Sequence, residues 1–216
     1  MSQNKIVVND AVKNFKEVAA LNHVSVSLET GKIHGIIGRN GSGKTVLFKC
    51  ICGFMTLTSG TILIDEKPII DVAHNIGAII EAPGFLPNYS GYQNLKFLAM
   101  IQNKINDDEI LKNMQRVGLD PESKKHVSKY SLGMRQRLGI AQAIMEDPDI
   151  LILDEPMNGL DNHGVEDIRN LLLNLKEEGK TILIASHSAE DIAVLCDTVH
   201  EMDAGVLTEV TKGNEA

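Results

Sequence analysis

The sequence predicts an α/β fold with a mainly parallel sheet, an N-terminal antiparallel β region and an inserted helical lobe. Two observations carry this prediction. Short apolar runs alternate with helical segments before residue 85 and after residue 146, which is typical of strands joined by crossover helices. Between these positions the strand pattern disappears and apolar residues take helical spacing. We therefore expect one domain over residues 1–216, with an α/β core at 1–84 and 147–216 and the lobe at about 85–146.

Length and composition exclude several classes of protein. A chain of 216 residues can bury one sizeable core, and its formal net charge of −8 argues against a nucleic-acid partner. Its three cysteines do not pair evenly, which indicates free thiols in a reducing compartment. Cys50 and Cys52 fall in a predicted helix, so core packing is favoured over a metal or redox pair. Neither a signal peptide nor an apolar run of about 18 residues is evident, and we expect a cytoplasmic protein.

The chain begins with two β-rich segments, Lys5–Val12 and Leu21–Leu28. In the second, apolar and polar residues alternate as in a half-buried strand. Phe15 lies between the two segments and allows two interpretations. It either packs into the core or stacks on a nucleotide base, and the residues alone leave both open.

The next strand, Ile33–Ile37, runs into a glycine-rich loop. Residues Gly38–Thr45 fit the phosphate-loop pattern G-x-x-x-x-G-K-[ST] at every fixed position, and a helix can follow. Glycines let the backbone wrap closely round a polyphosphate, and the backbone N–H groups then point at it from the start of the helix. Lys44 supplies a charge for the phosphates, and the Thr45 hydroxyl can ligate Mg²⁺. The expected phosphate-binding residues are Asn40, Gly41, Ser42, Gly43, Lys44, Thr45 and Val46.

Two more strands, Thr61–Ile64 and Ile76–Ile80, precede the lobe, and the second ends at Glu81-Ala82-Pro83-Gly84. Helix caps then mark the lobe. Ser90 can cap a first helix, Asn106 or Asp107 a second that Gly118 ends, and Ser131 a third. A serine with free backbone N–H groups at a helix start is also a candidate anion site.

After the lobe, Ile150–Leu153 is an apolar run typical of a strand buried on both faces, and Asp154-Glu155 follows it. A helix from Asn162 to Glu178, closed by Gly179, leads to a second such run, Thr181–Ala185, which ends at Ser186-His187. Residues Asp197–Val210 are compatible with an antiparallel edge hairpin through Asp203-Ala204-Gly205.

Three strand ends are expected to meet, because ligands of open α/β sheets bind at the carboxyl ends of the strands. Asp154 suits Mg²⁺, Glu155 can orient or deprotonate a water, and His187 can donate a hydrogen bond to a phosphate or to that water. The alternatives are a capping charge for the two acids and an ordinary satisfied histidine. Their position after buried strands favours the catalytic interpretation.

Together these motifs resemble the ATP-binding subunits of ABC transporters. Gly38–Thr45 is similar to the Walker A motif, Ile150–Glu155 to Walker B, Asn158–Asp161 to the D-loop, His187 to the switch histidine and Ser131–Arg137 to the signature sequence. The resemblance implies a P-loop NTPase core that binds ATP and Mg²⁺. It favours base stacking for Phe15.

The resemblance also implies partners. Two ATPase subunits, identical or different, would close head to tail on two ATP molecules. Each ATP would lie between one Walker A motif and the other subunit's Ser131 and Gly133. A separate transmembrane permease would hold the pair on the inner face of the cell membrane.

Two features depart from the common family pattern. Tyr130–Met134 replaces L-S-G-G-Q, and Glu81 stands where the family has its Q-loop glutamine. Both features resemble the branch that serves bacitracin-type and lantibiotic-type peptide exporters. The resemblance therefore implies export of an antimicrobial peptide, for resistance or self-protection, and a place for Glu81 near Mg²⁺. The alternative for Glu81 is a solvated loop carboxylate.

Other functions fit the same motifs. A soluble ABC ATPase acting on ribosomes or DNA usually has a second ATPase domain or a coiled-coil insertion, and this sequence has neither. A binding-only ATP switch would not need Glu155 and His187. An importer ATPase remains an alternative.

Overall fold

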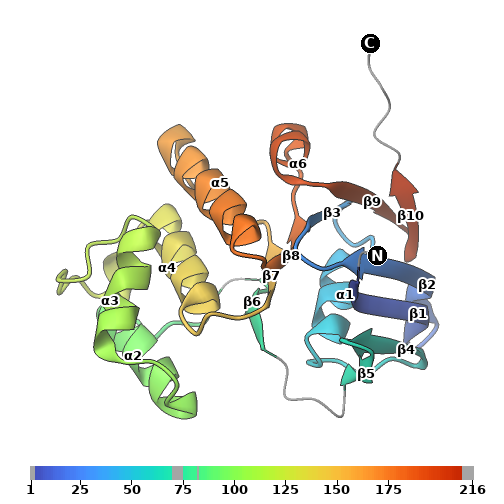
Figure 1. Ribbon diagram of the computed structural model, residues 1–216, viewed down its shortest axis with the longest axis horizontal. Helices are drawn as coiled ribbons and strands as arrows, with labels where there is room; N and C mark the ends of the chain where they lie inside the picture. Colours follow the sequence, from blue (N-terminus) through green and yellow to red (C-terminus); the bar gives the residue numbers. More distant parts are fainter. Residues whose placement is uncertain (1–2, 70–74, 82, 211–216) are drawn as a thin grey trace.

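A computed structural model describes residues 3–69, 75–81 and 83–210, which form two sheets and a helical lobe (Figure 1). The N-terminal sheet is antiparallel, with strand order β2-β1-β4-β5. Its strands are β1 (Asn4–Phe15), β2 (Val18–Glu29), β4 (Ser59–Ile64) and β5 (Lys67–Pro68). The predicted antiparallel β region is confirmed.

The second sheet is mainly parallel, with strand order β10-β9-β3-β8-β7-β6. Its strands are β3 (Ile33–Ile37), β6 (Ile76–Ile79), β7 (Ile150–Asp154), β8 (Thr181–Ala185), β9 (Thr198–Asp203) and β10 (Val206–Val210). Only β10 pairs antiparallel among the described strands of this sheet. The predicted hairpin is present; β10 forms one edge of the sheet, and β9 lies inside it beside β3.

Strands β7 and β8 are buried on both faces, which explains their unbroken apolar sequences. Leu151 and Leu153 of β7 pack in the core that contains the lobe helices. Ile150 and Ile152 point to the opposite face, into the core formed with the antiparallel sheet and α1. The parallel sheet therefore separates two hydrophobic cores.

The helices lie on both sides of this sheet (Figure 1). The described α-helices are α1 (Lys44–Ile51), α2 (Gly91–Gln102), α3 (Asp107–Arg116), α4 (Leu132–Ile144), α5 (Asn162–Glu177) and α6 (Ala189–Leu195), with a 3-10 turn at Val127–Lys129. In Figure 1, α2, α3 and α4 lie at one end of the molecule, and α1 with the antiparallel sheet lies at the other. The assignment of residues 1–216 to one domain, with the lobe inserted into the α/β core, stays a prediction.

The lobe helices begin where their capping residues predict. Ser90 and Gln93 form a capping box at the start of α2, and Asn106 and Glu109 form another at α3. The Ser131 hydroxyl accepts a hydrogen bond from the Met134 N–H at the start of α4. Polar side chains that satisfy free backbone N–H groups therefore fix all three starts.

Three features differ from the sequence-based expectation. Strand β1 extends to Phe15, because β1 and β2 pair as far as Phe15 and Val18 and leave only a tight turn between them. The two-residue strand β5 and the helix α6 were not predicted, because both are too short to show a periodic pattern. Ala82, expected at the end of a strand, lies outside the described residues.

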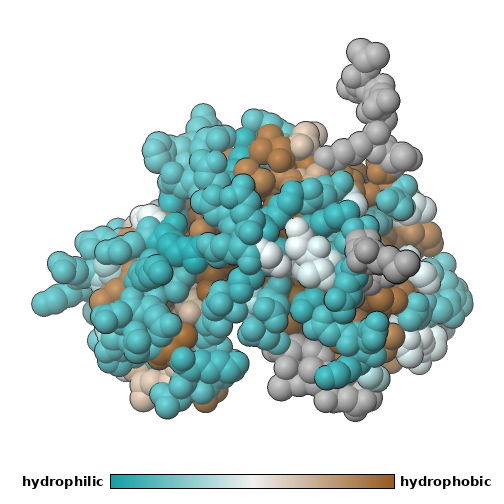
Figure 2. Space-filling model, in the orientation of Figure 1, coloured by the Kyte–Doolittle hydropathy of each residue, from teal (hydrophilic) through white to brown (hydrophobic). Residues whose placement is uncertain are grey.

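The face in Figure 2 is mostly hydrophilic, with apolar side chains gathered over α6 and β10. Val194, Val206 and Val210 are exposed there. Within the described part of the chain, every helix is too short or too polar to cross a bilayer.

Candidate functional site

The glycine-rich loop between β3 and α1 needs its glycines for conformation and space. Gly43 has φ 117°, and a Cβ there would lie 2.5 Å from the carbonyl oxygen of Ala20. The Lys44 side chain, 6% exposed, turns back over the loop. Its ammonium group donates hydrogen bonds to the carbonyl oxygens of Gly38 at 2.7 Å and Arg39 at 3.1 Å. The loop is therefore closed around a buried positive charge.

The start of α1 meets the end of β7 through one hydrogen bond. The Thr45 hydroxyl donates to Oδ2 of Asp154 at 2.8 Å. Oxygen donors of this kind are what Mg²⁺ prefers, and Mg²⁺ usually keeps several waters or phosphate oxygens beside one or two protein ligands. The described residues contain no group of three or more His, Cys, Asp or Glu side chains that could hold a metal. The Thr45 hydroxyl and the Asp154 carboxylate fit Mg²⁺ bound together with a phosphate ligand.

Glu155 lies directly after β7 and faces His187, which lies beyond the end of β8. Oε2 of Glu155 accepts a hydrogen bond from the His187 backbone N–H at 3.4 Å, and Oε1 lies 3.3 Å from Nε2 of the ring. Burial raises the pKa of Glu155 above its usual range; His187 opposes this effect, and the charge of Asp154 adds to it. Nε2 of His187 also lies 3.0 Å from Oδ1 of Asn40 in the glycine-rich loop. The three strand ends thus lie together.

One cavity of about 660 Å³ joins these groups. The predicted site residues that line it are Asn40, Gly41, Gly43, Lys44, Thr45, Val46, Glu81, Asp154, Glu155 and His187. Arg135, Gln136 and Asn158 also line it, although the sequence did not single them out as site residues. Gln136 additionally donates a hydrogen bond to the backbone carbonyl of Glu155 at 3.2 Å. In the sequence, only their positions pointed to the site: Arg135 and Gln136 follow Ser131, and Asn158 begins the D-loop motif.

Four predicted site residues do not line this cavity: Phe15, Ser42, Ser131 and Gly133. Phe15 is 46% exposed at the end of β1, and the Lys13 ammonium lies 5.3 Å from its ring centroid. Ser42 is buried, and its hydroxyl has no hydrogen-bond partner.

Ser131 and Gly133 lie together at the start of α4. The exposed Ser131 caps this helix. A Cβ at Gly133 would lie 2.7 Å from the carbonyl oxygen of Gly159. Gly133 therefore allows α4 to pack closely against the D-loop.

Glu81 lines the cavity but is paired with a cation. Its backbone has φ 63°, and its side chain is 64% exposed. Oε1 accepts a hydrogen bond from the Lys49 ammonium on α1 at 2.8 Å. The predicted place of Glu81 near Mg²⁺ stays a prediction, and in this structure its Oε1 pairs with Lys49.

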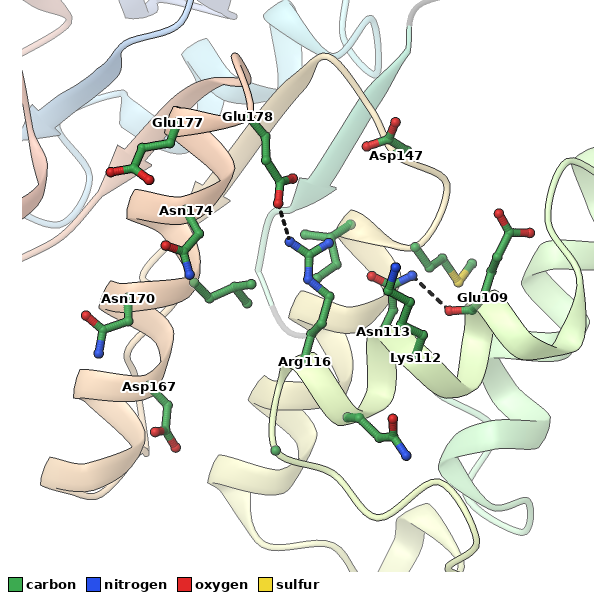
Figure 3. A pocket seen from close by; sticks show the side chains of 15 residues that line it. Glu109, Lys112, Asn113, Arg116, Asp147, Asp167, Asn170, Asn174, Glu177 and Glu178 are labelled. Carbon is green, nitrogen blue, oxygen red and sulfur yellow. Dashed lines mark hydrogen bonds and ion pairs between the residues drawn. The ribbon is translucent and has the colours of Figure 1, made fainter.

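A second cavity, of about 1070 Å³, lies between α3 and α5 (Figure 3). Acidic and amide side chains line most of it, and an ion pair of 3.1 Å between Arg116 and Glu178 spans it. None of the predicted site residues lines this cavity. We therefore assign the candidate nucleotide site to the smaller cavity.

Comparison with known proteins identifies the class. A family model described as ABC transporter matches residues 21–158, more than half of the chain. The chain therefore belongs to the ABC transporter family, and it is an ATP-binding subunit with the ATPase activity of that family.

Its relatives identify the branch within the family. The chain is 44% identical to the uncharacterized ABC transporter ATP-binding protein YybJ of Bacillus subtilis (strain 168), over 94% of each chain. It is 40% identical to the bacitracin transport ATP-binding protein BcrA of Enterococcus faecalis, over 94% of this chain and 68% of BcrA. It is 37% identical to the lantibiotic transport ATP-binding protein SrtF of Streptococcus pyogenes, over 89% of this chain and 84% of SrtF. The resemblance to the bacitracin and lantibiotic branch is confirmed.

A solved structure confirms the fold class. The dimeric, post-hydrolysis structure of the ATP-binding cassette MJ0796 bound to ADP and Pi superimposes with a TM-score of 0.89. It covers 97% of this chain and 99% of that one at 21% identity.

Proposed function

We propose that this chain hydrolyses ATP to drive a separate membrane permease that exports a membrane-active antimicrobial peptide. The observation that carries the proposal is the convergence of the glycine-rich loop, the Thr45–Asp154 pair and the Glu155–His187 pair on one cavity. The peptide cargo is supported by the similarity to BcrA and SrtF. In this proposal the chain lies on the inner face of the membrane through its permease.

The hydrolytic roles follow from the geometry of the cavity. Lys44 exchanges the Gly38 and Arg39 carbonyls for phosphate oxygens of ATP, and the loop N–H groups bind the same phosphates. Thr45 and Asp154 would hold Mg²⁺, which neutralises charge on the phosphates when bound.

Glu155 orients the attacking water and accepts its proton. The water oxygen bonds to the γ-phosphorus, the bond from that phosphorus to the bridging oxygen breaks, and ADP leaves. His187 donates a hydrogen bond to the γ-phosphate from the position where it contacts Asn40.

We further propose that two subunits close head to tail on ATP. Ser131 is exposed and lies outside the cavity of its own chain. In this proposal it therefore contacts the phosphates of the nucleotide that the partner subunit binds. The MJ0796 cassette, which has the same fold, forms a dimer. Whether the two subunits are identical depends on the transporter.

A mixed dimer tests this sharing of sites. One subunit carries Ser131→Arg and the other Lys44→Ala, so both lesions fall in one composite site and the other stays intact. Nucleotide trapping is expected to find one occupied site per dimer. Equal loss at both sites would contradict the shared arrangement.

Native membranes test the transport role. The tagged chain is purified from detergent-solubilised membranes of its source cell, and bound membrane proteins are identified by mass spectrometry. Deleting the chain or its permease is expected to sensitise the cell to bacitracin or to a lantibiotic, with a non-peptide antibiotic as control. Unchanged sensitivity to every peptide, with a permease bound, would refute the peptide cargo but not the ATPase role.

A further inference from the structure

A buried ion cluster lies beside the proposed catalytic residues. Arg169, in the middle of α5, is 6% exposed, and Asp191 of α6 is 3% exposed. Nε and Nη2 of Arg169 donate to Oδ1 of Asp191 at 2.8 and 2.6 Å. Nη1 of the same guanidinium reaches Glu166 at 2.8 Å and Glu190 at 3.0 Å, and both of these glutamates are exposed. The only buried carboxylate in contact with Arg169 among the described residues is therefore Asp191.

The second oxygen of Asp191 leads to the segment that carries His187. Oδ2 accepts a hydrogen bond from the buried Ser186 hydroxyl at 3.2 Å. That hydroxyl accepts the Ser188 N–H at 3.1 Å, and the Ser188 hydroxyl accepts the Asp191 N–H at 3.2 Å. The residues before and after His187 are therefore both tied to the ion pair, while the imidazole remains free to face Asn40 and Glu155.

Stability alone does not explain a buried ion pair at this place. Removing two charges from water costs several kcal/mol per ion, and apolar residues of similar volume often give equal or greater stability. A buried pair does fix one geometry, because its partners have few other ways to be satisfied. What this pair fixes is the backbone on both sides of His187.

We propose that Arg169, acting through Asp191 and Ser186, is a positioning residue that holds His187 in place for ATP hydrolysis. The inference rests on the proposed function, in which His187 acts on the γ-phosphate. Arg169 lies on the helix that follows the D-loop, since α5 begins at Asn162 after its N-cap Asp161. It therefore connects the D-loop element to the His187 segment across the cavity lined by Asn158, Arg169 and His187.

Two variants cut the connection at different points, and both are measured in the full-length ATPase. Ser186→Ala removes the link to His187 but leaves both partners of the Arg169–Asp191 pair in place, so we expect the fold to be retained. Asp191→Asn removes the charge that holds Arg169. Each is expected to lower kcat by about 10- to 100-fold with KM for ATP little changed, because small misplacements of a catalytic group cost rates of this order. Glu166→Gln is the matched control, since it removes an exposed partner of Arg169 with no contact to Ser186, and its kcat is expected to stay within about two-fold.

A double-mutant cycle separates positioning from general structure. In a His187→Ala background, Ser186→Ala is expected to cause no further loss of kcat, because the side chain to be positioned is absent. Multiplicative losses would overturn the inference, as would a Ser186→Ala protein with full turnover. Normal turnover of His187→Ala alone would refute the proposed role of His187 and the inference with it. If His187→Ala loses turnover while Ser186→Ala keeps full turnover, the inference is refuted and the proposed role of His187 stands.

Discussion

Replacing Glu155 with glutamine removes the proposed base while preserving its shape. The glutamine oxygen can still accept the His187 backbone N–H that Oε2 accepts now at 3.4 Å. Its amide nitrogen takes the place of Oε1, which makes no hydrogen bond and lies 3.3 Å from Nε2 of His187. We expect the variant to fold, and its midpoint of thermal unfolding to stay close to that of the parent protein.

The expected loss of activity follows from the proton transfer alone. A positioned general base contributes about 10²–10⁴-fold to a rate, which corresponds to about 3–5 kcal/mol of activation free energy. ATP affinity is expected to remain within several-fold, because the contacts of Lys44 and the Thr45–Asp154 pair do not involve Glu155. Binding without turnover is therefore expected to accumulate an ATP-bound dimer.

Three measurements check this prediction. Phosphate release at saturating MgATP gives kcat, titration of a fluorescent ATP analogue gives affinity, and size-exclusion chromatography with ATP gives the dimer. Glu177→Gln, an exposed substitution near the end of α5, is the control and is expected to be normal. Near-normal phosphate release by Glu155→Gln would refute the base assignment, and loss of ATP binding would show that the substitution disturbs the site.

Further predictions concern the pH profile, the Q-loop position and the glycine-rich loop. Because burial raises the pKa of Glu155 above its ordinary value of 4.5, the proton-accepting form is lost at a higher pH as the solution is acidified. The acidic limb of kcat against pH is therefore expected above 4.5, and a limb at or below that value would contradict the assignment. We propose that Glu81, which lies between the α/β core and the lobe in the chain, couples the nucleotide state to the permease. Glu81→Gln is therefore expected to leave basal ATPase activity within several-fold and to impair peptide resistance more strongly; collapsed hydrolysis with intact resistance would refute this coupling role. Gly43→Ala is expected to cost about 1–3 kcal/mol in urea unfolding, since its Cβ meets the Ala20 carbonyl at 2.5 Å. Gly41→Ala, also at positive φ but with open space, is the control, and equal costs would show that the clash is not responsible.

The sequence predicted the parts of the fold that have strong local signals. The apolar runs of β7 and β8 are long enough to mark strands buried on both faces. The serine and asparagine caps of α2, α3 and α4 use hydrogen bonds within one helical turn, so the sequence contains both partners. The two residues of strand β5 are defined as a strand by their pairing with β4, and no local sequence pattern predicts such a pairing.

The site was harder to predict where a contact joins distant segments. The motifs placed Thr45 in the loop and helix that follow one strand and Asp154 at the end of another, and the parallel sheet brings the two together. Arg169 carries no motif, and its partner Asp191 lies on a helix too short to be predicted. Tertiary packing determined both, and a single sequence does not show which polar residues packing will bury.

Glu81 illustrates how much a contact adds to a motif. The sequence placed its carboxylate near Mg²⁺, whereas the structure pairs it with Lys49 at 2.8 Å. Lys49 and Thr45 lie four residues apart on the same side of α1, about 6 Å along the helix axis. We propose that the carboxylate moves from Lys49 towards Thr45 when MgATP binds, because the bound metal would offer a higher charge than the ammonium group. Glu81 lies between β6 and the lobe helices in the chain, and we propose that such a shift links the nucleotide state to the lobe.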